Sequence, residues 1–229
     1  MPRKRNTRRR RTTKKKPFVK VQKGLSPAIY PFKRTISQTI GLNTSAPPEG
    51  WSVSGNNLYK NWGFSLSMLL DNTDFTNLFK YYRLKGVRIQ MYFSNTGSDA
   101  REGSVAPNKQ IIMWMDRNFD GQNTSSSGLE QTYLNSQTSK KRLCLRNNGK
   151  PLDIYMPLKQ QGMTYGGVGN TDYVLQSPKF ISTGEPATPH YGYKTMLQRV
   201  DGQAFTSGIS NSQYVKIIQT IYFQCKKVE

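Results

Sequence analysis

The sequence predicts an all-β protein: an eight-stranded single jelly-roll sandwich with long surface loops and a disordered basic N-terminal arm. A Greek-key barrel is the other arrangement that fits. The body of the chain is rich in Tyr, Thr, Ser, Asn, Gln and Gly and poor in Ala and Glu, which favours strands over helices. Apolar and polar residues alternate with a period of two in several segments. About eight such segments, without an internal repeat, are separated by long stretches of turn-forming residues.

Residues 1–16 form a basic arm in which ten residues are Lys or Arg, and no acid occurs before Glu49. A segment with so little apolar surface and so much charge does not collapse onto a core, so we expect it to be disordered alone. Such a segment can bind a polyanion such as a nucleic acid. When Lys and Arg contact the phosphates, condensed counterions are released, and this gain does not depend on the base sequence. The residues that we expect to bind nucleic acid are Arg3, Lys4, Arg5, Arg8, Arg9, Arg10, Arg11, Lys14, Lys15 and Lys16.

Within the arm, Arg8–Arg11 is expected to bind phosphate hardest, because a guanidinium pairs with phosphate through two hydrogen bonds. Nuclear-import signals have a similar basic composition, which here is found in Arg8, Arg9, Arg10, Arg11, Lys14, Lys15 and Lys16. The chain carries a net charge of +21, of which the first 48 residues supply +14. The basic residues between the arm and Glu49 are Lys20, Lys23, Lys33 and Arg34. Such polarity favours nucleic acid over a membrane surface, since the arm lacks large apolar residues.

Residues 17–28 are predicted to be a tether, because Pro17, Gly24 and Pro27 interrupt any regular pattern, and residues 29–229 to be one domain. No apolar run reaches transmembrane length, and none follows the basic start. The sequence therefore predicts neither a membrane span nor a signal peptide. Two cysteines, Cys144 and Cys225, do not make a disulfide framework and indicate a reducing compartment.

The first predicted elements are two strands and a short helix. Phe32–Ile40 alternates apolar and polar residues, and Trp62–Leu70 is predicted to be a half-buried strand whose even-numbered residues are all apolar. Asp74–Phe79 is predicted to be a short helix, with Asp74 or Thr73 as its N-cap.

Two further strands follow. Tyr81–Ser94 is long, but its apolar residues change parity part-way along, which predicts a β-bulge near Lys85–Gly86, where glycine tolerates the backbone. Ile111–Met115 is apolar at every position and is predicted to be a central strand buried on both faces.

The C-terminal half is predicted to contain four strands. Arg142–Arg146 and Leu152–Pro157 flank the turn-forming residues Asn147–Gly149, which indicates a hairpin. Tyr193–Val200 is the next strand, and Tyr214–Lys226 is the last, with Gln219 interrupting its apolar face.

Three long loops are predicted at residues 95–109, 116–139 and 159–191, the last being the longest irregular region. Loops of this length are uncommon in compact monomers unless they have a function. In a sandwich they gather at the two ends, where they could meet neighbouring subunits.

No motif predicts catalysis or a bound metal. Asp116–Gly121 matches the opening of a calcium loop, but Ser127 stands where that site needs a Glu, so we interpret it as a turn. Gly166–Gly169 lacks the Gly-Lys-Ser/Thr of a phosphate loop and is interpreted as a flexible surface loop. His190 is the only histidine, and both cysteines fall in predicted strands. The sequence therefore predicts no catalytic residue, no metal site and no cofactor.

The chain resembles the capsid proteins of circoviruses and related circular single-stranded DNA viruses. The segments that carry the resemblance, besides the basic start, are Phe79–Phe93 (FKYYRLKGVRIQMYF), Ile111–Phe119 (IIMWMDRNF) and Gln213–Lys226 (QYVKIIQTIYFQCK). The resemblance implies an eight-stranded jelly roll, of which sixty copies form an icosahedral (T=1) shell around a small circular genome. It also implies that the arm lies inside the shell and doubles as a nuclear-import signal.

We therefore predict a non-enzymatic coat protein that self-assembles and packages circular single-stranded DNA, found in the virion and, during assembly, in the host nucleus. Its predicted partners are the genome, further copies of itself, a host nuclear-import receptor and a host attachment factor. The alternative is a β-barrel nucleic-acid-binding regulator or ribosomal-type protein. A carbohydrate-binding jelly roll or hydrolase is a third class, for which the sequence shows no carboxylate pair or aromatic platform.

Overall fold

The computed structural model describes residues 28–95, 111–117, 135, 137–144, 151–165, 171–205 and 213–227. The predicted arm, residues 1–16, lies outside the described residues, and so does the tether except for Ala28. The same holds for most of the loops predicted at 95–109 and 116–139, for the predicted turn at Asn147–Gly149, and for Gly166–Gly169.

The first sheet has the order β1-β12-β4, with β7 and β10 paired to the other edge of β4. All of these pairs are antiparallel. The five strands are β1 (Ile29–Leu42), β4 (Tyr81–Asn95), β7 (Leu152–Pro157), β10 (Ile181–Ser182) and β12 (Gln213–Lys226).

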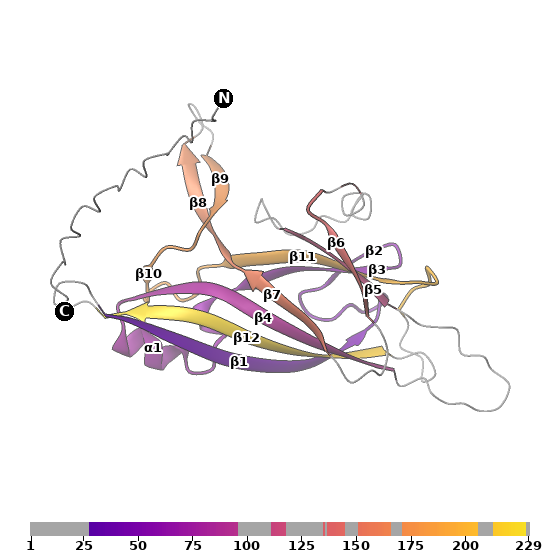
Figure 1. The fold of residues 1–229 in the computed structure, drawn as a ribbon, viewed down its shortest axis with the longest axis horizontal. Coiled ribbons are helices and arrows are strands. Elements are labelled where there is room, and N and C mark those ends of the chain that lie inside the picture. Colours follow the sequence, from indigo (N-terminus) through magenta and orange to yellow (C-terminus); the bar gives the residue numbers. More distant parts are fainter. Residues whose placement is uncertain are drawn as a thin grey trace, which may run out of the picture.

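The second sheet has the order β2-β3-β11-β5-β6 and is antiparallel throughout. The start of β11 also pairs with β8, which forms a hairpin with β9 that projects from the sandwich (Figure 1). The seven strands are β2 (Ser52–Ser54), β3 (Asn57–Phe64), β5 (Ile111–Arg117), β6 (Lys140–Cys144), β8 (Lys159–Tyr165), β9 (Thr171–Gln176) and β11 (His190–Arg199).

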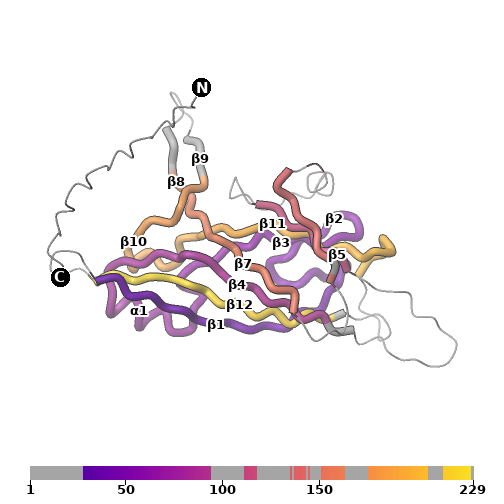
Figure 2. Tube along the Cα trace, in the orientation of Figure 1, coloured from indigo at the N-terminus to yellow at the C-terminus, as the bar shows by residue number. Residues whose placement is uncertain are grey.

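Eight of these strands form a jelly roll with the orders β1-β12-β4-β7 and β3-β11-β5-β6. The chain crosses repeatedly between the two layers, so neighbours in a sheet are far apart in the sequence. Figure 2 shows β1 in indigo lying beside β12 in yellow, and the two pair over their full lengths from Ile29–Lys226 to Leu42–Gln213. The predicted jelly-roll class is confirmed, and the Greek-key barrel is not the arrangement observed.

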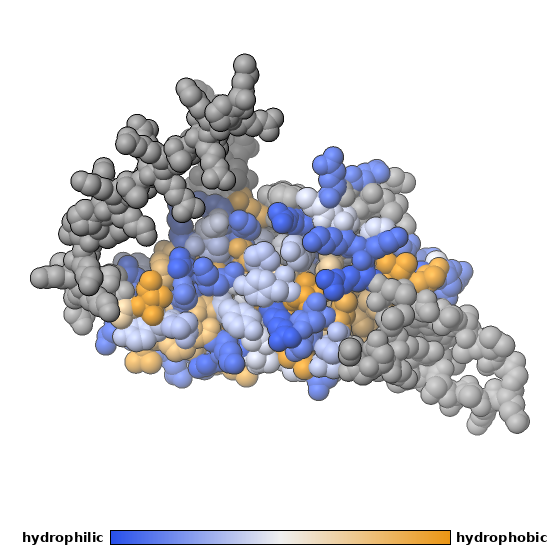
Figure 3. All heavy atoms as spheres, viewed as in Figure 1, coloured by the Kyte–Doolittle hydropathy of each residue, from blue (hydrophilic) through white to orange (hydrophobic). Residues whose placement is uncertain are grey.

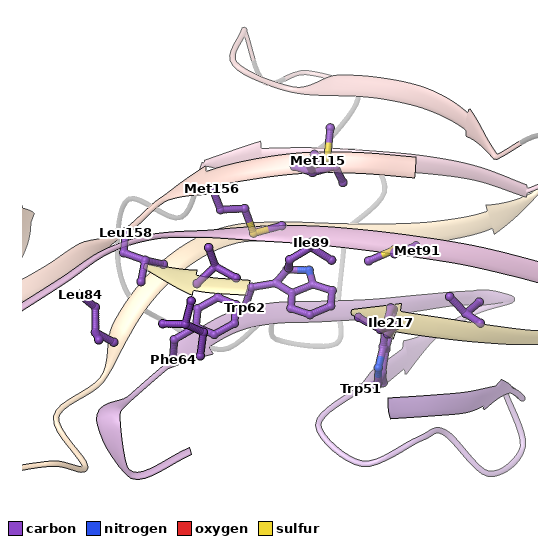
Figure 4. Packing of buried hydrophobic residues seen from close by; sticks show 14 of the residues in the cluster. Trp51, Trp62, Phe64, Leu84, Ile89, Met91, Met115, Met156, Leu158 and Ile217 are labelled. Carbon is purple, nitrogen blue, oxygen red and sulfur yellow. The ribbon is translucent and has the colours of Figure 1, made fainter. Parts of the chain in front are cut away.

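The core lies between the two sheets and takes alternate side chains from β4, β5 and β12. Figure 4 shows residues of both layers meeting there, among them Trp62 and Phe64 of β3 and Ile89 and Met91 of β4. The Trp62 indole is buried but satisfied, because its Nε1 donates to Thr195 Oγ1 at 2.9 Å.

The predicted β-bulge in β4 is confirmed. Along β12, Tyr222 pairs with Gly86 and Phe223 with Leu84, so Lys85 is the additional residue. The extra residue allows Leu84 and Val87 both to face the core, which explains the change of parity in the sequence. A Cβ on Gly86 would lie 3.0 Å from the Met156 carbonyl oxygen and against the Tyr155 hydroxyl, so glycine also permits the approach of β7.

The predicted strand Trp62–Leu70 is wrong beyond Phe64. β3 ends there, and η1 (Leu66–Met68) is a short 3-10 turn that carries the chain toward the other sheet. Leu66 and Leu69 both reach the core, because a spacing of three suits a 3-10 turn, whereas Leu70 is fully exposed.

The predicted helix exists but begins earlier, as α1 (Asn72–Leu78), and its N-cap is Asp71 and not Asp74 or Thr73. Asp71 makes no capping hydrogen bond to α1, because its carboxylate instead accepts from Arg34 Nε at 2.6 Å. The Asp71 side chain therefore makes an ion pair with a distant strand, where a helix N-cap normally accepts a hydrogen bond from the first turn of its own helix.

The predicted hairpin between Arg142–Arg146 and Leu152–Pro157 is wrong. β6 pairs with β5 in the second sheet, whereas β7 pairs with β4 in the first. The loop predicted at 159–191 is also partly wrong, because β8, β9 and β10 lie within it.

The other predicted strands are confirmed with small changes. Ile111–Met115 is central, between β11 and β6, but only its odd-numbered residues are fully buried, while Ile112 and Trp114 are half-buried. β1, β11 and β12 contain the segments predicted as Phe32–Ile40, Tyr193–Val200 and Tyr214–Lys226, apart from Val200 just after β11. Gln219 is buried on the same side of β12 as the apolar residues, so it interrupts the apolar face as predicted while the strand continues.

Candidate nucleic-acid interface

The ten arm residues predicted to bind nucleic acid lie outside the described residues, but the structure places the point where the arm joins the domain. The described chain begins at Ala28, and Ile29 at once pairs with Lys226 at the end of β12. The arm therefore joins the sandwich at an edge strand of the first sheet.

The side of the first sheet that points away from the core is basic. In β12 the odd-numbered residues from Val215 to Cys225 are buried, so the even-numbered residues point outward. Pairing register and exposure assign the outward residues of the neighbouring strands. We call this surface the cationic face; its basic residues are Lys33, Arg83, Lys85, Arg88, Lys216 and Lys226.

The cationic face is formed by β1, β12, β4 and β7, and these four strands contain a single acid, Asp153 of β7. Asp153 accepts from Arg88 Nε at 2.9 and 3.0 Å and also pairs with Arg88 Nη2, and this pairing lowers the pKa of the carboxyl. None of the other five cations has an ion-pair partner among the described residues. The face therefore keeps an excess of positive charge that is open to an anionic ligand.

Exposed tyrosines lie between these cations. Tyr81, Tyr92, Tyr155 and Tyr214 are 39%, 39%, 55% and 41% exposed. Tyr155 also packs against Tyr222, with 6.2 Å between the ring centroids. Aromatic rings beside cations are the usual platform for single strands, because every base can stack on a ring while its phosphate meets a charge.

Phe180 sits at the end of the face where β1 begins, close to Lys226, the partner of Ile29. Arg83 Cζ lies 4.5 Å from its ring centroid and Lys226 Nζ lies 5.8 Å away. The Arg83 guanidinium is further oriented by a hydrogen bond from Nε to Gln224 Oε1 at 2.9 Å. These contacts hold the two cations in place without neutralising them.

The outward side of the second sheet differs, although several of its strands are also basic. Its apolar residues Tyr59 and Met196 are 1% and 0% exposed, and Trp114 packs against them. Figure 3, which looks onto the first sheet, shows mainly hydrophilic residues over β1, β12 and β4. We therefore identify the cationic face as the candidate interface.

Two of the basic residues noted before Glu49 have different roles in the structure. Lys33 belongs to the cationic face, whereas Arg34 points to the opposite side of β1. Arg34 pairs with Asp71 and lies 5.0 Å over the Phe75 ring, so it attaches α1 to the sheet. Sequence reasoning missed the cations of β4 and β12, although period two does place Lys216 and Lys226 opposite the buried residues of β12.

The structure offers no support for a thiol or histidine nucleophile. Burial raises the pKa of both Cys144 and Cys225 to about 12, so both remain protonated thiols at neutral pH. The described residues contain no group of three His, Cys, Asp or Glu side chains that could hold a metal ion. Within the same residues, no helix is long and apolar enough to cross a membrane.

The buried His190 makes stability depend on pH. Desolvation lowers its pKa from 6.5 to about 4, its Nδ1 lies 3.1 Å from the Thr188 carbonyl oxygen, and its Nε2 is buried without a partner among the described residues. Between these two pKa values the unfolded chain binds a proton that the folded chain does not. We expect the free energy of unfolding to fall by about 1.4 kcal/mol per pH unit as the pH drops from 6.5 toward 4.

Urea unfolding at pH 7, 6, 5 and 4.5 measures this slope. His190→Gln removes the titrating group, so its slope between pH 6 and 5 should be nearly flat, whatever the variant's absolute stability. Equal slopes in the two proteins would show that other groups titrate in this window.

Comparisons with known proteins agree with this architecture. The sequence profile of the circovirus capsid protein family matches residues 1–229. The 60-mer BFDV capsid protein is similar in structure, with a TM-score of 0.56 and 12% identity over 88% of this chain and 95% of that chain. The decameric BFDV capsid protein matches with a TM-score of 0.50 and 14% identity over 87% of this chain and 100% of that chain. No curated protein matches the chain in sequence.

Proposed function

Because this chain belongs to the circovirus capsid protein family, we propose that it assembles into an icosahedral shell of sixty copies and packages circular single-stranded DNA. Family membership confirms the predicted class of a non-enzymatic coat protein. The observation that carries the packaging proposal is the junction of the arm with the cationic face. Ten basic residues precede a strand whose own sheet presents further cations without an ion-pair partner among the described residues.

The proposed shell rests on the fold and on one similar structure. A 60-mer is known for the BFDV capsid protein, whose fold this chain shares. A closed shell needs repeated symmetric contacts between identical copies, which a rigid sandwich can supply. These observations favour a coat protein over a β-barrel regulator, for which neither the fold nor the family offers a parallel.

The charges are sufficient to neutralise much of a small genome. Sixty arms of ten charges would neutralise about 600 phosphates at one phosphate per charge. The five cations of the cationic face that have no ion-pair partner among the described residues would add about 300 more on the same assumption. We propose that the arm condenses the DNA and that the cationic face forms the wall against which the DNA lies.

The arm has a second proposed role. Arg8–Arg11 with Lys14–Lys16 provides the clustered positive charge that import receptors bind, and assembly in the host nucleus would require the coat protein there. Import would precede packaging, so the same residues can serve both roles in turn.

Neutralising three lysines of the cationic face should reduce packaging. The change Lys33→Gln, Lys216→Gln and Lys226→Gln removes three charges from exposed or half-exposed positions without altering the core. We expect the slope of log K against log[salt] for single-stranded DNA to become shallower by about two. Each of the three lost phosphate contacts contributes about 0.7 to that slope. Particles of the variant should also protect less DNA from nuclease.

The matched control is Lys140→Gln, Lys141→Gln and Lys159→Gln, which removes the same charge from the second sheet. This control should keep a salt slope close to that of the unaltered chain. If both triple variants lose the same slope, DNA binding depends on net charge alone and the cationic face is not the interface.

A further inference from the structure

The outward side of α1 is apolar in a way that the fold does not explain. Leu70, just before the helix, is 101% exposed and Leu78, at its end, is 63% exposed. They are the most exposed large apolar side chains among the described residues. Asp74 and Asn77 are exposed between them at helical spacing, opposite the buried Phe75. We call Leu70, Asp74, Asn77 and Leu78 the α1 stripe.

The α1 stripe is held rigidly against the sandwich. Phe75 inserts between Phe32 and Phe223, with ring centroids 5.1 and 4.9 Å away. The Arg34–Asp71 ion pair fixes the start of the helix. The exposed side chains are therefore presented by an ordered surface, and a partner would not have to order that surface on binding.

A pocket of about 390 Å³ opens at the other end of α1. Its lining includes Leu78, Lys80, Tyr81 and Lys227. Both lysines are exposed, and neither has an ion-pair partner among the described residues. The pocket thus combines apolar walls with two unpaired positive charges, a few residues away from the acid of the α1 stripe.

We propose that the α1 stripe and this pocket together form a two-fold contact between two copies of this chain. An isologous contact requires a surface that complements itself, so that residue i meets residue j and residue j meets residue i. Here the only charged residue of α1 is Asp74, and Lys80 follows the helix. With two helices antiparallel about an axis near Asn77, Asp74 of each copy lies opposite Lys80 of the other.

The same arrangement accounts for the apolar residues. Leu78, one residue from the axis, would pack against Leu78 of the second copy. Leu70 would extend toward the pocket of the second copy, where Phe79 offers an apolar wall. Burying these leucines removes apolar surface from water, which is favourable for association.

Charge complementarity selects a second copy as the occupant. The chain has 34 basic and 13 acidic residues, so an exposed acid between exposed leucines stands out against a basic surface. A second copy satisfies Asp74 and Lys80 together, whereas a phosphate attracted to Lys80 and Lys227 would be repelled by Asp74. This contact rests on the proposed assembly into a shell and names one surface that would take part in it, and it requires no DNA.

A charge swap tests the contact. Asp74→Lys and Lys80→Asp should each raise the concentration needed for half-assembly by about tenfold, since each change places like charges together at two symmetric points. The double variant Asp74→Lys, Lys80→Asp restores opposite charges across the axis and should return assembly close to that of the unaltered chain. Sedimentation velocity of the nuclease-treated full chain at one fixed salt concentration measures the assembled fraction.

The controls separate the contact from net charge and from folding. Glu49→Lys changes the net charge as much as Asp74→Lys does but lies elsewhere on the surface, so it should assemble normally. Leu78→Ser should weaken assembly, whereas Val200→Ser, at a residue that is 50% exposed away from α1, should not. Thermal melts confirm that each variant is folded. A double charge variant as impaired as the single variants, or normal assembly by Leu78→Ser, overturns the proposal.

Discussion

Deleting residues 2–16 is expected to remove most of the chain's affinity for single-stranded DNA while leaving the sandwich folded. The deletion removes ten positive charges, and none of the described core contacts involves these residues. If each charge meets one phosphate, the slope of log K against log[salt] should become shallower by about seven. At physiological salt this corresponds to a loss of several orders of magnitude in affinity. Fluorescence anisotropy with a labelled oligonucleotide, measured across a salt series, gives both quantities.

Two variants of the arm separate charge from sequence. An arm with the same residues in scrambled order should bind DNA nearly as well as the native arm, because phosphate contacts carry no base sequence. Replacing Arg8–Arg11 with Lys keeps the charge but should weaken binding, since Lys lacks the bidentate geometry.

The deletion should also keep a fluorescent fusion of the chain out of the nucleus. Affinity that survives the deletion unchanged would contradict the assigned role of the arm.

Phe223→Ala is expected to lower the free energy of unfolding by about 3–5 kcal/mol. Phe223 is 1% exposed and stands where β12, β1 and α1 meet, with ring centroids 5.5 Å from Phe32 and 4.9 Å from Phe75. Alanine leaves a cavity that the rigid sheets cannot close, so the transfer energy and the packing energy are both lost. Such a loss is a large part of the roughly 5–15 kcal/mol that stabilises a typical domain, and few particles should accumulate in cells at 37 °C.

Chemical unfolding of the purified chain measures this loss. Phe223→Leu retains most of the volume and should cost about 1–2 kcal/mol. Tyr222→Ala, at the adjacent residue whose side chain points outward, should cost about 1 kcal/mol or less. If Tyr222→Ala destabilised the chain more than Phe223→Ala, the assignment of the inward and outward sides of β12 would be wrong.

Local patterns in the sequence were sufficient for the longest strands. β12 shows a period of two over almost its whole length, and the change of parity in β4 located the bulge to the residue pair Lys85–Gly86. These predictions succeed because the alternation of side chains is a property of the strand itself. A bulge leaves a trace in the same pattern, since one inserted residue reverses every later side chain.

The failed predictions concern segments whose partners are distant in the sequence. Asn147–Gly149 is a good local turn signal, yet β6 and β7 pair with strands of different sheets. The even-numbered residues of Trp62–Leu70 are all apolar, yet the chain leaves the sheet after Phe64 to reach the other layer. In each case the competing local structure loses because burial between the sheets contributes more than the local preference.

The same division applies to the candidate interface. The arm could be proposed from composition, because a dense run of cations binds polyanions without any fixed geometry. The cationic face could not be assembled in this way, since its residues come from β1, β4 and β12 and meet only through strand pairing.

The polarised charge, the periodicity of the strands and the bulge can therefore be predicted from the sequence alone, because each depends only on residues that are neighbours in the chain. The sheet order, the attachment of α1 by Arg34 and the convergence of Lys33, Arg83 and Lys216 on one side of a sheet were decided by the tertiary structure. The physical reason is that a strand's alternation defines two faces but not which of them is buried. That choice is made only when two sheets pack and exclude water between them.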